Sequence, residues 1–225
     1  MADAQFLSSS QSTVAETHKV LRNTYMLLSM TLLFSAGMAA VAMAMEAPHM
    51  GWMPLILALG LLFAISKFKN SGWGILLVFA FTGILGFSLG PILNMYMQTQ
   101  AGTQTVVTAA GLTGLIFLSL SGYVLVSKKD FSFMGGFLMA GMWVVIGSIV
   151  LLFVGSMLGW QVSGLHLAIS AAIVMLMSGL ILYDTSRIIN GGETNYIMAT
   201  VGLYLTIYNL FTSLLHLLGA FGGDD

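Results

Sequence analysis

The fold is decided by the stretch LHLAISAAIVMLMSGLILYDTSRIINGGETNY, residues 165–196, in which a long apolar run ends in charged and glycine-rich residues. The apolar part, residues 165–183, is long enough to cross a bilayer core of about 30 Å at roughly 1.5 Å per residue. Asp184 follows at one membrane face, and Arg187 lies three residues later on the same side of the helix. An acid near a helix C-terminus opposes the helix dipole, so Asp184 is expected to seek a cation. The pattern indicates either an end-of-helix ion pair or a gate or proton site that needs this acid.

The composition is that of a membrane protein. Of the 225 residues, 58% are hydrophobic and 7% are charged, against about 25% charged in ordinary soluble domains. So few charges cannot cover a soluble globule, which predicts an all-α, multi-span membrane protein with one domain. Seven basic and eight acidic side chains exclude the basic surface of a nucleic-acid binder. The lack of cysteine excludes disulfides and thiol catalysis, and the 17 scattered methionines favour core filling over metal binding.

Seven apolar stretches are predicted to cross the membrane. They are residues 25–45, 52–66, 73–95, 105–126, 131 or 134 to 158, 165–189 and 196–220. The second is short, so Lys67 and Lys69 at its end are expected to reach up to the membrane face. Residues 1–23 are predicted to form a flexible cytoplasmic tail, residues 24–221 the seven-helix domain, and residues 222–225 a short tail on the outer face.

The positions of the cations predict the orientation of the chain. In the seven-span arrangement every lysine and arginine falls on the side of the N-terminal tail. They are Lys19, Arg22, Lys67, Lys69, Lys128, Lys129 and Arg187. The positive-inside rule makes that side cytoplasmic, with the C-terminus on the opposite side. Six or eight spans would scatter these cations over both faces, so the charge pattern also favours seven.

Small residues are expected where membrane helices approach closely. The candidates are Gly83, Gly86, Gly90, Gly111, Gly114, Gly135, Gly136, Gly141 and Gly179.

Two patterns resemble catalytic or metal-binding motifs. Residues 86–90, with Ser88 at their centre, match G-x-S-x-G, and His216 opens an H-x-x-G-x-x-x-G spacing, as in rhomboid intramembrane proteases. A glycine-rich helix gives the first pattern readily and the strand-turn-helix context is absent, so a Ser88 and His216 protease is an outside alternative. His166 and His216, both expected near the outer face, could sense pH or share a metal. No carboxylate or cysteine joins them at the same depth, which favours polar packing or a water contact over a metal site. No catalytic residue, resident metal or cofactor is predicted.

A polar patch interrupts the last apolar stretch. Thr206 and Asn209 lie three residues apart, with Tyr204 and Tyr208 beside them. Polar groups in a membrane helix are expected to face a neighbouring helix. Counted from the short connection between the last two spans, Thr206 lies somewhat deeper in the membrane than Asp184, by no more than about two helical turns. Together these residues predict a hydrogen-bonded plug.

Several segments resemble the Bax inhibitor-1 family, in its bacterial YccA-like branch. They are THKVLRNTY at 17–25, KDFSF at 129–133, LILYD at 180–184, GGETNY at 191–196, YL at 204–205 and NLF at 209–211. The resemblance covers about residues 17–219. It implies a location in the bacterial inner membrane and a bundle in which six helices surround a central seventh. In that membrane, the orientation predicted from the cations places the C-terminus in the periplasm.

The resemblance implies two activities. YccA-like members bind and restrain the membrane protease FtsH, partly through the N-terminal tail, to which Thr17, His18, Lys19 and Arg22 would belong. Other members are pH-sensitive calcium leaks, in which two aspartates on the last two helices share a proton. Asp184 matches the first aspartate, whereas Thr206 stands where the second is expected, so coupling between two acids cannot raise a pKa here.

The departures from the leak pattern favour the regulator. The family's arginine that pairs with the acid has only Lys67 or Lys69 as a counterpart, and lysine is the poorer partner for a carboxylate. The favoured function is a non-enzymatic inner-membrane regulator, whose partners are the FtsH complex and the lipid bilayer. The alternative is a leak gated at Asp184, with Arg187, Thr206 and Asn209 at the gate and Ca²⁺ as the permeant ion. The sequence leaves the oligomeric state open.

Overall fold

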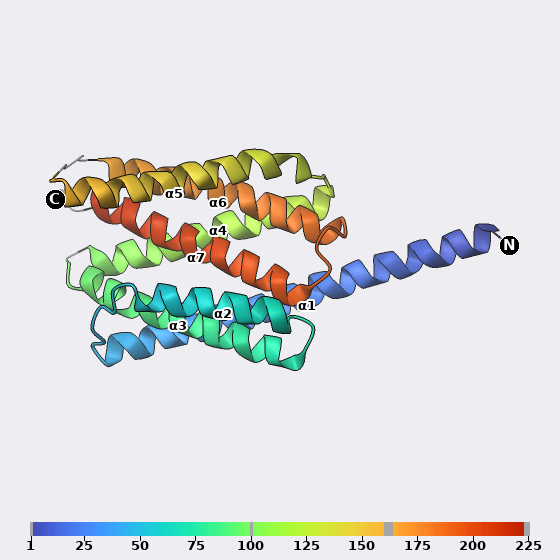
Figure 1. Ribbon diagram of the computed structural model, residues 1–225, viewed down its shortest axis with the longest axis horizontal. Coiled ribbons are helices and arrows are strands. Elements are labelled where there is room, and N and C mark those ends of the chain that lie inside the picture. Colours follow the sequence, from blue (N-terminus) through green and yellow to red (C-terminus); the bar gives the residue numbers. More distant parts are fainter. Residues whose placement is uncertain (1, 100, 160–163, 223–225) are drawn as a thin grey trace. The chain divides into compact units, whose positions relative to one another are not determined.

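The computed structural model describes residues 2–99, 101–159 and 164–222, and every regular element within these ranges is helical (Figure 1). The elements are α1 (Ala2–Ala44), α2 (Met53–Phe68), α3 (Gly72–Met97), α4 (Gly102–Ser127), the 3-10 turn η1 (Ser132–Met134), α5 (Gly135–Met157), α6 (Leu165–Ile189) and α7 (Tyr196–Phe221). The all-α prediction is confirmed, and each predicted span overlaps one of these helices.

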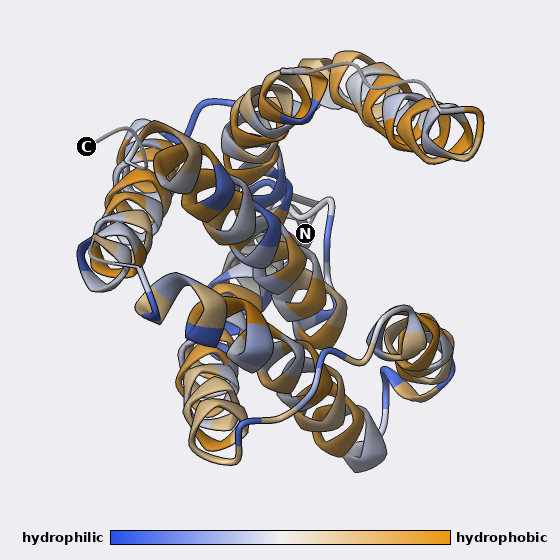
Figure 2. Ribbon diagram, turned by 90° about the vertical axis from the view of Figure 1, so that its left-hand side faces the viewer, coloured by the Kyte–Doolittle hydropathy of each residue, from blue (hydrophilic) through white to orange (hydrophobic). Residues whose placement is uncertain are grey.

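Six of the helices in the described ranges are long and apolar enough to cross a membrane, namely all but α2. Helix α2 carries Pro54 in its first turn. Its 16 residues span about 24 Å, which is shorter than a bilayer core of about 30 Å. Figure 2 shows hydrophobic residues along the helices and hydrophilic residues mainly in the connecting segments. The multi-span prediction is therefore confirmed for six helices by length and composition.

Helix α1 begins earlier than the first predicted span. It runs from Ala2, so the structure describes residues 2–23 as helical and continuous with the span. The flexibility of this stretch and its cytoplasmic side stay predictions. At the other end of the chain, residues 223–225 of the predicted outer tail lie outside the described residues.

The chain divides into two compact units, which we describe separately. The first comprises Met1–Met95 and Arg187–Tyr204, and the second comprises Tyr96–Ser186 and Leu205–Asp225. In the first unit, the N-terminal part of α1 extends beyond α2 and α3 (Figure 1).

Helix α1 packs closely on α3 along the predicted glycine face. A Cβ atom on Gly83 would lie 2.8 Å from Cε1 of Phe34, closer than real Cβ contacts come. Cβ atoms on Gly86 and Gly90 would collide with α1 itself, the first with the carbonyl oxygen of Ser35. Larger residues at Gly86 or Gly90 would force the two helices apart, whereas one at Gly83 would displace the Phe34 ring. The predicted close packing is confirmed for these three positions.

In the second unit, α5 packs on α6 through small residues. A Cβ atom on Gly179 would lie 2.7 Å from Cδ2 of Leu138, and one on Gly141 would collide with Leu176. A Cβ atom on Gly135 would lie 3.1 Å from the Tyr183 ring. Close packing is therefore confirmed at these three glycines as well.

The same prediction is wrong for three other glycines. A Cβ atom on Gly111, Gly114 or Gly136 would meet no atom of the described residues within 4 Å. Helix α4 instead buries another face, which includes Ala109, Thr113, Phe117, Ser121 and Val124. These follow one another at intervals of three or four residues and so form a stripe along the helix, from which the two α4 glycines point away.

Candidate docking site at the α6–α7 loop

The GGETNY segment is a compact turn between two helices. Gly191 adopts a left-handed conformation with φ of 75°. The amide of Gly192 donates to the carbonyl of Arg187 at 2.8 Å, and the amide of Gly191 donates to that of Ile188 at 3.4 Å. This pair of bonds is a Schellman cap, which requires a residue with positive φ, and glycine adopts that conformation without steric cost. The first glycine of the segment therefore ends α6.

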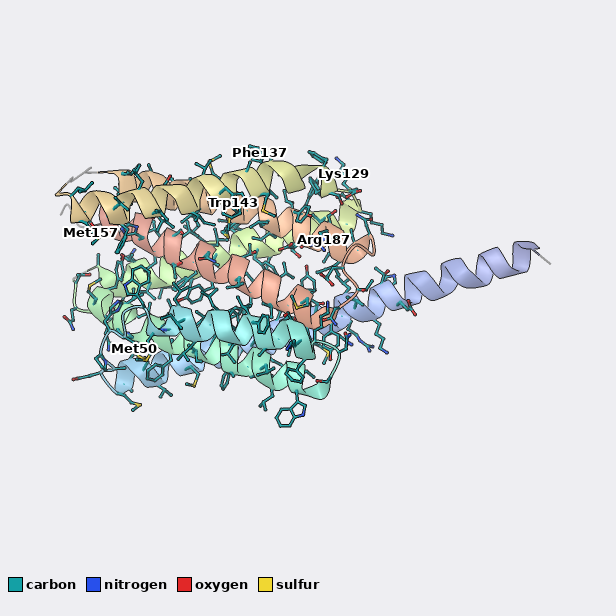
Figure 3. All side chains as sticks on the ribbon, in the orientation of Figure 1. Met50, Lys129, Phe137, Trp143, Met157 and Arg187 are labelled. Atoms are coloured by element: carbon teal, nitrogen blue, oxygen red, sulfur yellow. The ribbon has the colours of Figure 1, made fainter. Side chains whose placement is uncertain are left out.

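The side chain of Arg187 stays within this turn (Figure 3). Its Nη2 atom lies 3.6 Å from Oε2 of Glu193 and donates to the carbonyl of Gly192 at 3.3 Å. The predicted cation at the end of α6 thus has an ion-pair partner that the sequence argument did not consider. Both side chains are partly exposed, so this pair contributes at most about 1 kcal/mol and mainly orients Glu193.

Asn195 connects three segments of the first unit. Its Oδ1 accepts a hydrogen bond from the amide of Met198 at 3.0 Å, which makes Asn195 the N-cap of α7. Its Nδ2 donates to the carbonyl of Lys69 at 3.0 Å and to Oδ1 of Asn70 at 2.9 Å, in the α2–α3 connection. The Asn195 amide also donates to Oε1 of Glu193 at 2.9 Å. A cap residue ahead of an apolar stretch is readable from sequence, whereas the bonds to the α2–α3 connection are not.

A pocket of about 340 Å³ lies between this turn and α1. Its lining residues are Glu16, Thr17, Lys19, Val20, Asn23, Gly191, Glu193, Thr194 and Tyr196. We call it the loop pocket. It brings two of the predicted tail residues, Thr17 and Lys19, together with the GGETNY segment. Of the other two, His18 and Arg22 are exposed and, within the described chain, do not line this pocket.

Cations gather at the same end of the first unit. Lys19 lines the loop pocket, Arg187 pairs with Glu193 in the turn, and the backbone of Lys69 is bonded to Asn195. These three cationic residues therefore lie at one end of this unit, while the orientation of the chain in the membrane stays a prediction.

The predicted gate residues lie on α6 and α7. Asp184 is half-buried, Thr206 is 4% exposed, and Asn209 donates from its Nδ2 to the carbonyl of Leu205 in its own helix at 2.8 Å. The inward orientation expected for Thr206 is confirmed by its burial. The plug formed by the three side chains stays a prediction.

The two candidate counter-ions have contacts of their own. Lys67 places its Nζ atom 5.6 Å from the centre of the Phe63 ring, one turn earlier on α2. Such a cation–π contact is worth about 0.5–1 kcal/mol at an exposed site. The carbonyl of Lys69 accepts the bond from Asn195 described above. Their role as counter-ions of Asp184 stays a prediction.

The residues of the protease alternative each have another hydrogen-bond partner. The Ser88 hydroxyl donates to the carbonyl of Leu85 at 2.7 Å, within α3. His216 shares a hydrogen bond of 2.8 Å between its Nδ1 and Oγ of Ser170 on α6, a pairing that sequence spacing did not suggest. This agrees with the polar packing expected for His216, while His166 is exposed. Among the described residues there is no cluster of three or more histidine, aspartate or glutamate side chains that could hold a metal ion.

A second polar cluster, also missed by the sequence argument, joins the α4–η1 turn to α6. Oδ1 of Asp130 accepts hydrogen bonds from the amide of Ser132 at 2.8 Å and from the Ser186 hydroxyl at 3.2 Å. Oγ of Ser186 in turn accepts the amide of Phe131 at 2.8 Å. Hydrogen bonds from Ser132, and to a lesser extent from Ser186, lower the pKa of the Asp130 carboxyl. The Asp-x-Ser order is typical of an Asx turn and could have predicted the local half of the cluster.

Six apolar helices of the described ranges, each long enough to span a membrane, define a multi-span helical membrane protein. Residues 17–223 match the family model described as inhibitor of apoptosis-promoting Bax1, and the chain belongs to this family, Bax inhibitor-1. The predicted family is thereby confirmed.

Relatives match along nearly the whole chain. The modulator of FtsH protease YccA from Escherichia coli K12 is 48% identical over 214 residues, which cover 94% of each chain. An uncharacterized membrane protein of Vibrio cholerae is 48% identical over 221 residues, covering 97% of this chain and 96% of its own. An uncharacterized protein of Pseudomonas aeruginosa is 47% identical over 227 residues, covering all of both. The matched E. coli strain O6:H1 protein is named inner membrane protein YccA.

Proposed function

We propose that this chain is a non-enzymatic regulator of the bacterial inner membrane that binds and restrains the FtsH protease. The observation that carries the proposal is the 48% identity, over 94% of both chains, to a protein named modulator of FtsH protease. At this identity and coverage, the match leaves no large segment of either protein unaligned. A shared mode of action is therefore the simplest inference.

The loop pocket supports the proposal from the structural side. It joins the predicted partner-binding residues Thr17 and Lys19 to the GGETNY segment, which is held in place by two helix caps. A partner that grips the N-terminal stretch therefore meets an ordered surface at its base.

The proposed arrangement in the membrane has seven crossings with α7 at the centre. Half of the apolar window of α7 is buried, against 11% in α5, as expected if α7 is surrounded by other helices. Helix α2 would be the seventh crossing, because local thinning of the bilayer and snorkelling of flanking residues such as Lys67 and Lys69 accommodate a short span at modest cost. The cations at one end of the first unit support a cytoplasmic N-terminus and a periplasmic C-terminus.

The test is degradation by purified FtsH in proteoliposomes. With the full-length chain co-reconstituted, degradation of a membrane substrate should slow down, and the rate should depend on the amount of chain added. Removal of residues 1–17 should leave insertion intact and change either the inhibition or the chain's own degradation. An unchanged rate with the full-length chain, in membranes where both proteins are inserted, would rule the proposal out.

A cation leak gated at Asp184 is the second proposal. Its support is the half-buried side chain of Asp184 in an apolar helix, since an ionisable group inside the membrane is costly and by default marks a functional site. In liposomes, Asp184→Asn should change calcium flux and its pH dependence. Absence of flux in wild type between pH 5 and pH 8, the range in which buried carboxyl groups commonly titrate, would eliminate it.

A further inference from the structure

We infer that the loop pocket binds an extended segment of the partner protein through a basic side chain of that segment. The inference rests on the proposed function, in which the chain docks with another membrane protein. It adds the place of the contact and the chemistry of the group that is received.

The size and lining of the pocket suit a peptide side chain with its backbone. Its volume of about 340 Å³ lies at the lower end of the range of about 300–1,000 Å³ found for ligand sites. Thr17, Thr194 and Asn23 line it with hydroxyl and amide groups, which both donate and accept hydrogen bonds, as a peptide backbone requires. Val20 and Tyr196 add apolar surface against which a side-chain stem can pack.

The charges of the lining favour a cation. Glu16 and Glu193 contribute two carboxylates, while Lys19 contributes the single ammonium of the described lining. Glu193 is already engaged by Arg187 and by the amide of Asn195, so exposed Glu16 is the carboxylate that meets an incoming group. An anionic lipid headgroup would instead meet the Glu16 carboxylate at the mouth of a lining that holds two carboxylates and one ammonium. The lining therefore selects a lysine or arginine side chain over a lipid phosphate.

One wall of the loop pocket is the preformed α6–α7 loop, and the opposite wall is the helix that continues into the N-terminal stretch. The Schellman cap at Gly191 and the α7 cap at Asn195 fix the loop, and Asn195 anchors it to the backbone of Lys69. A preformed loop loses little conformational entropy on binding, which favours affinity. The opposite wall is α1, whose N-terminal part extends beyond its neighbours in the unit (Figure 1). A protein that grips this part is thereby positioned to insert a residue into the pocket.

The test is site-specific photo-crosslinking of the full chain co-reconstituted with FtsH. A photoreactive amino acid replaces exposed Thr194, and the crosslinked peptides are identified by mass spectrometry. We expect adducts with an FtsH segment that contains lysine or arginine. Glu16→Gln should lower the adduct yield about fivefold, the effect of losing one ion pair of roughly 1 kcal/mol. Glu46→Gln is the matched control, because Glu46 is an exposed carboxylate after the far end of α1 and should leave the yield unchanged.

The outcomes separate this inference from the proposed function. If wild type slows FtsH, while position 194 gives adducts only with lipid, or Glu16→Gln leaves the yield unchanged, the pocket assignment is wrong and the regulator stands. If wild type neither slows FtsH nor crosslinks to it, both are wrong. A pocket-filling variant, Asn23→Trp, gives a second check: it should reduce the adduct and the inhibition together, provided that it melts like wild type.

Discussion

The hydroxyl oxygen of Tyr204 lies 2.6 Å from Oγ of Ser35, and both side chains are buried in the first unit. The same hydroxyl donates to the carbonyl of Thr82 at 3.2 Å, so one atom connects α7 to both α1 and α3. The ring packs edge to face on Phe81, with centroids 6.0 Å apart. This cluster fixes the beginning of α7 against the glycine-packed pair α1 and α3, and so fixes the position of the loop pocket.

Replacing Tyr204 by phenylalanine should therefore destabilise the protein. The change keeps the ring but leaves the Ser35 hydroxyl and the Thr82 carbonyl without this partner. Hydrogen bonds between membrane helices contribute about 0.6 kcal/mol on average and up to about 1.7 kcal/mol. We expect Tyr204→Phe to lower the free energy of unfolding by about 1–2 kcal/mol, measured by SDS titration of the protein in detergent micelles. Tyr123→Phe, at an exposed tyrosine, should have little effect; equal losses in both variants would contradict the assigned role.

Two glycine substitutions should change stability in opposite directions. Alanine at Gly86 would collide with the carbonyl oxygen of Ser35, which belongs to a backbone that cannot move aside without separating α1 from α3. We expect a loss of about 1–3 kcal/mol, typical of overpacking. Alanine at Gly111 meets open space and should gain up to about 1 kcal/mol from helix propensity. SDS unfolding of the two variants measures both, and a stabilised Gly86→Ala would contradict the close approach.

These glycines also show how far the sequence predicts the fold. Hydropathy and span length identified the six long helices of the described ranges, because the bilayer requires about 20 apolar residues whatever their neighbours are. The same small residue, however, packs at Gly86 and faces open space at Gly111. Which face of an apolar helix meets another helix depends on the rotation of both helices. A chain that is apolar on all faces carries no periodic signal for that rotation.

Asn195→Ala should loosen the α6–α7 loop. The variant loses the α7 cap at Met198 and the two bonds to Lys69 and Asn70. The cap alone is worth about 1 kcal/mol, so a total loss of about 1–2 kcal/mol is expected. Asn70→Ala removes one of the three bonds and should lose much less. Hydrogen exchange of residues 191–196 measures the effect locally, and unchanged exchange in Asn195→Ala would contradict the anchoring role.

The candidate site was predicted only in part, as the contacts of Asn195 and Asp130 show. The sequence identified the GGETNY segment through its resemblance to a family, and it suggested Arg187 as the cation that Asp184 seeks. The acid found beside Arg187 is Glu193, brought close by the turn at Gly191. The bonds from Asn195 to Lys69, and from Ser186 to Asp130, join residues far apart in sequence. Such pairs follow from helix packing, which spacing along the chain does not encode.

The Asp130 cluster should make stability depend on pH in the acid range. Hydrogen bonds from Ser132 and Ser186 lower the pKa of Asp130 in the folded state. The contribution is therefore fully present above the pKa of the unfolded chain, about 3.9, and is lost as the pH falls through the lower folded-state value. As the pH falls below about 4, the melting temperature of wild type should therefore fall more steeply than that of Asp130→Asn. Glu46→Gln, which neutralises an exposed carboxylate elsewhere, should keep the slope of wild type; parallel curves for all three proteins would contradict the role of Asp130.

The proposed orientation can be tested within the first unit alone. The sequence contains no cysteine, so a single introduced cysteine is the only thiol available for labelling. Thr194 lies by the loop pocket, next to residues 16–23 of α1, and Glu46 follows the opposite end of the same helix. Residues 16–44 of α1 are long and apolar enough to cross the membrane, so the two positions should lie on opposite faces. Because the cations lie beside Thr194, the positive-inside rule makes its face cytoplasmic.

In intact spheroplasts an impermeant maleimide should label Glu46→Cys and spare Thr194→Cys, and lysis should expose both. Labelling of Thr194→Cys in intact spheroplasts, with Glu46→Cys protected, would invert the topology and place the loop pocket out of reach of a cytoplasmic partner domain.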